Sequence, residues 1–194
     1  KYLKDTPNFR KFDGNVMYKG YYFTLKKNIY DNDRTKNNIP EFVINNDKNF
    51  KGKRINICNL SSKCNKILEI GCNAGHSLLL MLYSNPNSIF YCFDICIRPY
   101  TIPCIEYLKK EFPNRINFII GDSLETLPKF LEENEITFDL FHIDGGHTPE
   151  ILSNDFNCCY KLSYENSLFI IDDTHEPSLN KFTALDSIPQ SFDL

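Results

Sequence analysis

Tryptophan is absent from this 194-residue chain, methionine occurs only twice, and no apolar run reaches the length of about 18 residues that a transmembrane helix needs. The polar start of the chain contains no apolar signal-peptide core. The net charge is −3, and no Lys/Arg stretch is dense enough to bind duplex nucleic acid. We therefore expect a soluble cytoplasmic protein whose partner is a small molecule, with neither a membrane nor a nucleic acid as partner.

The eight cysteines lack the spacing of a zinc site. Neither Cys58 and Cys64 nor Cys92 and Cys96 form a C-x-x-C unit. Most of the cysteines fall inside apolar segments, where a free thiol behaves as a small hydrophobe. We expect buried, unpaired cysteines in a reducing compartment.

Two regions differ in pattern. Residues 1–60 are rich in Asn, Lys, Tyr and Asp and have weak periodicity, which indicates an N-terminal appendage or lid. Residues 61–194 alternate short apolar runs with helical segments, which is typical of one α/β domain with a parallel sheet. We expect strands at 66–70, 88–93, 116–120, 138–143 and 167–171, and helices at 75–83, 102–112, 122–133 and 148–162.

Helix-start residues support these boundaries. Thr101 is the expected N-cap of the second helix. Asp122 and Glu125 have capping-box spacing, and Thr148 followed by Pro149 is a typical helix start. Five successive strand–helix units predict a doubly wound, mostly parallel sheet with helices on both faces.

Ligands of such sheets bind at the carboxyl ends of the strands, so polar residues there are candidates. The first strand ends in a bend with Glu69, Gly71 and Gly75, whose spacing is not the G-x-G-x-x-G of a pyrophosphate site. The bend suits a ligand that has an amino group and no pyrophosphate. Asp94, after the second strand, suits a ribose diol, and Asp122, after the third, suits either an adenine amino group or a helix cap.

The segment Glu69–Gly75 looks like motif I of class I S-adenosylmethionine-dependent methyltransferases. Together with 121–123, 138–144 and 169–173 it resembles catechol- and caffeoyl-CoA-type O-methyltransferases and their small-molecule and sugar-modifying relatives. The likeness covers about residues 64–176 and implies a Rossmann-like fold with S-adenosylmethionine as cofactor. The cofactor-binding residues that it implies are Glu69, Gly71, Asn73, Gly75, Ser77, Asp94, Asp122 and Ser123.

A divalent cation is one device that would activate the acceptor hydroxyl. Asp144 follows the fourth strand, and Asp172 and Asp173 follow the fifth, so their carboxylates are able to converge. Such hard oxygen ligands suit Mg²⁺ or Ca²⁺. The relatives commonly have Asn where this chain has Asp173, and the alternative is that Asp172 and Asp173 are only a polar strand end.

A general base is the second device. His147 stands where the catechol-type relatives have a lysine, and histidine titrates near neutrality. We interpret His147 as a base, with a metal ligand or a rim residue as alternatives. Asp144 is the second residue that we predict to be catalytic. His142 alternates within an apolar strand and is expected to be a core histidine.

These features predict an S-adenosylmethionine-dependent O-methyltransferase acting on the hydroxyl of a sugar, polyol or phenol. The alternative is an inert binding or structural module inside a larger polypeptide, because the relatives add two strands after the fifth and this chain lacks a clear pattern for them. An NAD-linked oxidoreductase is disfavoured by the glycine spacing. A homo-oligomer, or further domains of the same polypeptide, would protect the exposed sheet edge.

Overall fold

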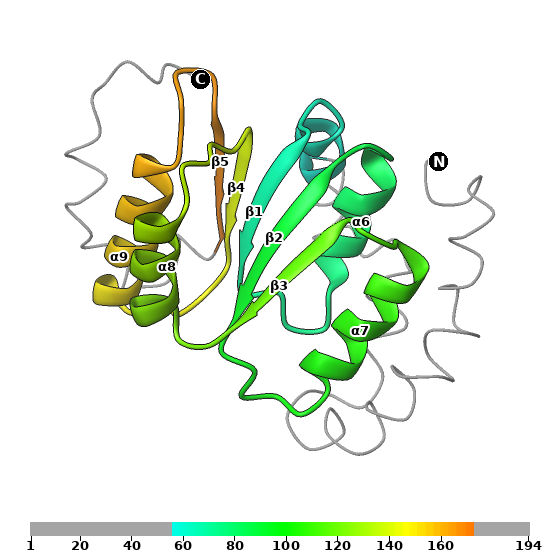
Figure 1. The fold of residues 1–194 in the computed structure, drawn as a ribbon, viewed down its shortest axis with the longest axis horizontal. Coiled ribbons are helices and arrows are strands. Elements are labelled where there is room, and N and C mark those ends of the chain that lie inside the picture. The colour runs from blue at the N-terminus through cyan, green and yellow to red at the C-terminus, as the bar shows by residue number, and fades with distance from the viewer. Residues whose placement is uncertain (1–55, 173–194) are drawn as a thin grey trace. The chain divides into compact units, whose positions relative to one another are not determined.

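The computed structural model describes residues 56–172 (Figure 1). These residues divide into two compact units. The predicted appendage therefore lies almost entirely outside the described residues, as do Asp173 and the region of any further strand. We call the units the sheet unit, residues 63–72, 87–95 and 116–172, and the helical unit, residues 56–62, 73–86 and 96–115.

The sheet unit contains five parallel strands in the order β3-β2-β1-β4-β5. The order reverses around β1, the kind of position at which open α/β sheets bind ligands. The predicted α/β fold with a parallel sheet is thus confirmed. The strands are β1 (Lys66–Ile70), β2 (Ile89–Asp94), β3 (Ile116–Ile120), β4 (Leu140–Ile143) and β5 (Leu168–Ile171).

Alternation along the central strands gives the sheet two faces, and both are buried. Leu68 of β1 and Phe141 of β4 belong to the hydrophobic core that contains residues of α8 (Ser123–Glu133) and α9 (Pro149–Lys161). Successive strand residues point to opposite faces, so Glu69 and His142 lie on the face away from that core. The sheet therefore presents two ionisable side chains on one face of its centre.

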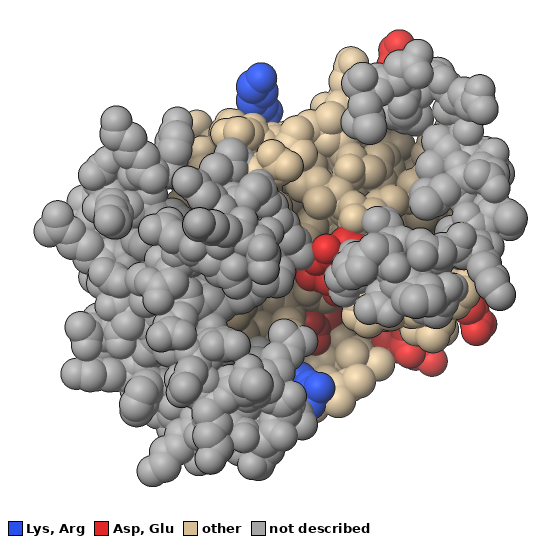
Figure 2. All heavy atoms as spheres, turned by 180° about the vertical axis from the view of Figure 1, so that it is seen from behind, with Lys and Arg blue, Asp and Glu red and all other residues tan. Residues whose placement is uncertain are grey.

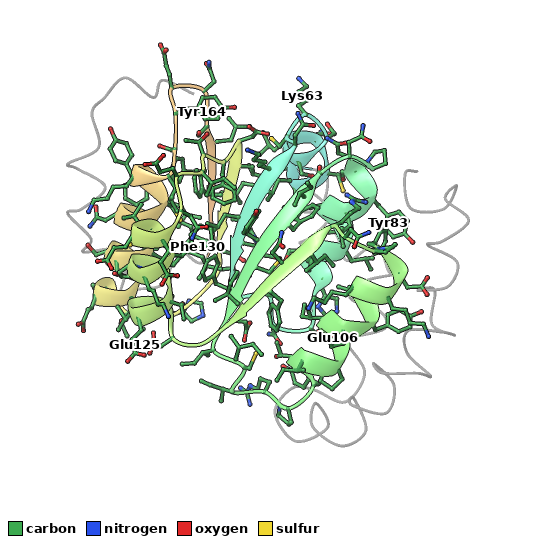
Figure 3. All side chains as sticks on the ribbon, viewed as in Figure 1. Lys63, Tyr83, Glu106, Glu125, Phe130 and Tyr164 are labelled. Atoms are coloured by element: carbon green, nitrogen blue, oxygen red, sulfur yellow. The ribbon has the colours of Figure 1, made fainter. Side chains whose placement is uncertain are left out.

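Helices α8 and α9 stand side by side against the sheet (Figure 1). Phe130 of α8 reaches the strands (Figure 3), with its ring centroid 5.7 Å from Tyr91 and 5.4 Å from Phe93. Full burial of one such ring contributes about 1.5–3 kcal/mol. Aromatic packing of this kind fixes α8, and with it the turn after β3.

Both helix starts that were predicted in this unit are confirmed. The Asp122 carboxylate accepts a hydrogen bond from the Leu124 N–H at 3.0 Å and caps α8. The Thr148 hydroxyl accepts one from the Ile151 N–H at 3.3 Å, with Pro149 in the first turn of α9. These caps place the turns after β3 and β4.

The helical unit contains α6 (His76–Ser84), α7 (Thr101–Glu111) and a helical segment at 56–61. Gly75, before α6, has φ +79°, and a Cβ there would lie 2.6 Å from Leu108 Cδ1. The Arg115 guanidinium donates to the carbonyls of Leu82 and Asn85 at the end of α6. Glycine at the start and arginine at the end thus define the limits of α6.

The prediction that Thr101 caps the second helix is wrong. Tyr100 is the N-cap, with helical backbone angles (φ −85°, ψ −17°), and Thr101 is already the first helical residue. Its side chain is buried, so it packs against neighbours instead of capping.

Among residues 56–172, no helix combines the length and apolarity that crossing a bilayer requires.

Candidate functional site

The residue after each of three strands continues the hydrogen-bonding ladder of the sheet. Gly71 N–H donates to Phe93 O at 2.8 Å, Asp144 N–H to Ile70 O at 2.9 Å, and Asp172 N–H to Ile143 O at 2.9 Å. The turns after β1, β4 and β5 therefore start side by side, at the carboxyl ends of the strands. The predicted convergence of polar residues at these ends has a backbone cause.

Gly71 allows the turn after β1 and the turn after β4 to lie in direct contact. Its φ is +85°, and a Cβ on it would lie 1.9 Å from the carbonyl oxygen of Asp144. A backbone oxygen cannot move aside as a flexible side chain does, so only glycine fits. The bend after β1 is consequently packed directly on the turn that carries Asp144.

The rest of the bend belongs to the helical unit. Asn73 has φ +51° and Gly75 φ +79°, and Ser77 lies in the first turn of α6. Two left-handed residues within three positions form a tight turn before the helix. Backbone N–H groups at a helix N-terminus are suited to bind anions such as a carboxylate, as expected of Ser77 and its neighbours.

Glu69 and His142 form a fully buried pair on the face of the sheet opposite the core that contains α8 and α9 residues. They are directly paired across β1 and β4, and His142 Nδ1 lies 3.0 Å from Glu69 Oε1. Burial acts to lower the pKa of His142, but the hydrogen bond and charge of Glu69, with the charges of Asp144 and Asp172, raise it above its ordinary value. The expectation of a core histidine is confirmed for burial.

His142 is nevertheless incompletely satisfied. Its Nε2 is buried and, among the described residues, finds no hydrogen-bond partner. A ring nitrogen of His142 and one carboxylate oxygen each from Asp144 and Asp172 lie within 4.8 Å of one another. The structure therefore brings Asp144 and Asp172 together, as predicted, and adds a histidine that the sequence did not indicate.

The remaining predicted residues are placed as follows. Asp94 ends β2 and is half-buried, and its carbonyl accepts a hydrogen bond from Gly121 N–H at 3.0 Å. Ser123 begins α8, and its carbonyl accepts a hydrogen bond from the Asn154 side chain at 3.1 Å. For Asp122 the capping alternative is observed, and its contact with adenine stays a prediction.

His147 lies on the loop between β4 and α9 and is exposed. The loop is held close to its surroundings by glycines: a Cβ on Gly146 would lie 2.6 Å from Ile151, and one on Gly145 would lie 3.0 Å from Asp155 and from Ile70. His147 is not a member of the cluster of His142, Asp144 and Asp172, and its role as a base stays a prediction.

Most of the cysteines are buried, as predicted. All eight lie within the described residues, none of them forms a disulfide, and six of them are buried. Burial, followed by the neighbouring Cys92, raises the pKa of the Cys72 thiol well above its ordinary value. The Cys72 thiol is therefore protonated at neutral pH. Acidic side chains are more prominent than basic ones on the described surface that Figure 2 shows.

The fold and site define an α/β protein with an open parallel sheet and acidic residues at its carboxyl edge. Residues 68–174 match the family model described as a methyltransferase domain. Because this match covers more than half of the chain, the chain belongs to that family. The predicted S-adenosylmethionine-dependent methyltransferase is thereby confirmed.

Solved structures share the fold at low identity. The O-methyltransferase TomG from Streptomyces achromogenes is 15% identical, with 86% of this chain and 77% of that chain covered and a TM-score of 0.62. A TDP-rhamnose 3'-O-methyltransferase of calicheamicin biosynthesis is 18% identical, with 95% and 89% covered and a TM-score of 0.61. An O-methyltransferase from Bacillus cereus is 16% identical, with 91% and 77% covered and a TM-score of 0.59. No curated protein sequence matches the chain.

Proposed function

We propose that this chain transfers the methyl group of S-adenosylmethionine to a hydroxyl oxygen of a sugar, polyol or phenol, with a divalent cation at the acceptor. The observation that carries the proposal is the close approach of Asp144 and Asp172 at the sheet edge where Gly71 forms its bend. The solved relatives that share the fold are named as O-methyltransferases, one of them acting on TDP-rhamnose, which supports oxygen as the acceptor atom.

The bend after β1 would hold the methionine part of the cofactor, because glycine there lets the ligand approach the backbone closely. The half-buried Asp94 is placed at a strand end, where a carboxylate accepts two hydrogen bonds from a ribose diol. Glu69 is fully buried and bonded to His142, so it also supports the sheet centre. The cofactor-binding residues proposed are Glu69, Gly71, Asn73, Gly75, Ser77, Asp94, Asp122 and Ser123.

The carboxylates fit a cation. Two acids close together are costly unless a positive charge or a proton offsets their repulsion. Asp144 and Asp172 would be ligands, and Asp173, the next residue in the chain, would be a third. A bound cation would lower the pKa of the acceptor hydroxyl.

His147 would accept the proton of the acceptor hydroxyl. It follows Asp144 by three residues, and its exposed imidazole is able to meet a substrate. Bound S-adenosylmethionine would supply the methyl group, whose bond to sulfur would break as the acceptor oxygen bonds to it, with S-adenosylhomocysteine as the leaving product. The chain's task is to align the two reactants and to take up one proton.

Titration calorimetry tests the proposal. We expect saturable binding of S-adenosylmethionine and none of NAD. Incubation with sugars, polyols and phenols should then release S-adenosylhomocysteine in step with methylated product. Failure to bind S-adenosylmethionine would refute the proposed function, and binding without turnover of any acceptor would favour the inert module.

The cation is tested separately. Turnover should fall in EDTA and return on adding a divalent ion, and Asp144→Asn should abolish that response. Undiminished turnover in EDTA would remove the cation from the reaction.

A further inference from the structure

The centre of the sheet holds a buried imidazole beside the two acids. His142 is 0% exposed, and Glu69 occupies its Nδ1 at 3.0 Å. Its Nε2 is buried without a hydrogen-bond partner among residues 56–172. Such an unmade hydrogen bond costs about 1–3 kcal/mol unless another group compensates it.

Strand register explains why these groups meet. His142 is paired with Glu69 on β1 and with Ile170 on β5. Asp144 and Asp172 each lie two residues beyond a member of this row, and residues two apart share a face. A ring nitrogen of His142 and a carboxylate oxygen of each aspartate accordingly lie within 4.8 Å of one another.

Glu69 prepares the imidazole for a particular use. In the neutral imidazole, a carboxylate that accepts a hydrogen bond from Nδ1–H leaves the lone pair on Nε2, and it orients the ring. A metal ion that binds at Nε2 displaces the proton held there by the imidazolium form. Histidines that bind metals almost always donate the other ring N–H to a carboxylate, a backbone carbonyl or a water molecule, and Glu69 is such a partner. Because Nδ1 is engaged, Nε2 is the nitrogen able to serve as a ligand.

We propose that His142 Nε2 ligates a divalent metal together with Asp144 and Asp172, with Glu69 as the residue that orients the histidine. This site extends the all-oxygen set of the proposed function, and in its role for methyl transfer it rests on that function. One nitrogen and two carboxylates suit Mn²⁺, Fe²⁺, Co²⁺ or Zn²⁺ better than Mg²⁺ or Ca²⁺. The metal selected would be a first-row transition ion.

A purely structural role is the rival explanation. In that case His142 only pairs with Glu69, a proton balances the carboxylates, and the ring never contacts a metal. Loss of stability on substitution would be common to both explanations, so the test must observe the metal itself.

The test uses the full chain without any acceptor. Mn²⁺ binding is followed by electron paramagnetic resonance, and echo modulation detects ¹⁴N bound to the ion. We expect Mn²⁺ to bind at least about tenfold more tightly than Mg²⁺, with a nitrogen coupling that is absent in His142→Gln. That variant should bind Mn²⁺ about 10–100-fold more weakly, and Glu69→Gln should weaken binding by a similar factor, as loss of an orienting partner does.

Asp139→Asn is the matched control. Asp139 lies just before β4, at the opposite end of the strand from Asp144, so its loss should reduce stability without changing Mn²⁺ affinity. Circular dichroism confirms that each variant is folded. If a variant fails to fold, the nitrogen coupling in the unmodified chain still decides.

Bound Mn²⁺ without a nitrogen coupling, unchanged affinity in His142→Gln, or no bound ion would each overturn this inference. Such results leave the methyltransferase intact if S-adenosylmethionine still binds and acceptors still turn over. Conversely, nitrogen-coupled Mn²⁺ in a chain that does not bind S-adenosylmethionine would refute the proposed function alone.

Discussion

Gly71 is the residue on which the site geometry depends most directly. Gly71→Ala would combine a disfavoured positive φ with a Cβ 1.9 Å from a backbone oxygen, so we expect a loss of about 3 kcal/mol or more in the free energy of unfolding. Urea denaturation measures it. Gly145→Ala is the control, because its Cβ would meet only side-chain atoms, at 3.0 Å, and its loss should be clearly smaller. Equal losses would contradict the close approach of the two turns.

His147 yields a kinetic prediction. If it takes the acceptor proton, His147→Asn should lower kcat by about 10²–10⁴-fold, as removal of a general base does. Calorimetric affinity for S-adenosylmethionine should be unchanged, since the exposed side chain lies outside the proposed cofactor set. Unaltered turnover would assign His147 to the rim of the site.

At the scale of single residues, the sequence predicted which side chains belong to the site better than it predicted the contacts between them. Asp144 and Asp172 were found because each directly follows an apolar strand. The pairing of His142 with Glu69, which are 73 residues apart, depends on β1 and β4 being neighbours in exact register. That information resides in the strand order, so His142 was assigned only to the core.

At the scale of elements, Asp122 serves as the test. Asp122→Ala should remove the cap of α8 and cost about 1 kcal/mol, whereas Asp122→Asn, which retains an accepting oxygen, should cost little. Chemical denaturation of the two variants measures the cap. Calorimetry with S-adenosylmethionine measures the adenine contact, and if both variants bind the cofactor as the unmodified chain does, Asp122 is a cap and nothing more.

Elements were largely predictable because their boundaries have strong local signals. β1 and β3 match their expected bounds, and α9 begins at its Thr148–Pro149 signal. Thr101 misled because a cap residue is also a small residue that packs well, and only the tertiary environment decides between these uses. Helix α7 begins at Thr101, one residue earlier than predicted.

At the scale of the whole molecule, Asp139 ties together chain segments that are distant in sequence. Burial acts to raise its pKa, but hydrogen bonds from the Lys66 and Asn65 N–H groups and the Tyr164 hydroxyl lower it below the ordinary 3.8. A carboxyl whose folded-state pKa is depressed stabilises the fold above its unfolded pKa and loses that contribution as pH falls through the folded value.

The stability difference between the unmodified chain and Asp139→Asn should therefore be largest near neutral pH and shrink below about pH 4. Denaturation between pH 6 and pH 3 measures it. Tyr164→Phe, which removes one of the three bonds, should show the same trend with smaller amplitude. A difference independent of pH would mean that Asp139 contributes by packing alone.

Strand β4 has a dynamic consequence. Every one of its residues is buried, and the strand is hydrogen-bonded to β1 on one side and to β5 on the other. Amides held in this way exchange with deuterium only when a large part of the sheet opens. Within the sheet unit, the segment that presents His142 and leads into Asp144 should thus be among the last to take up label, which makes it a rigid platform for whatever ligand it binds.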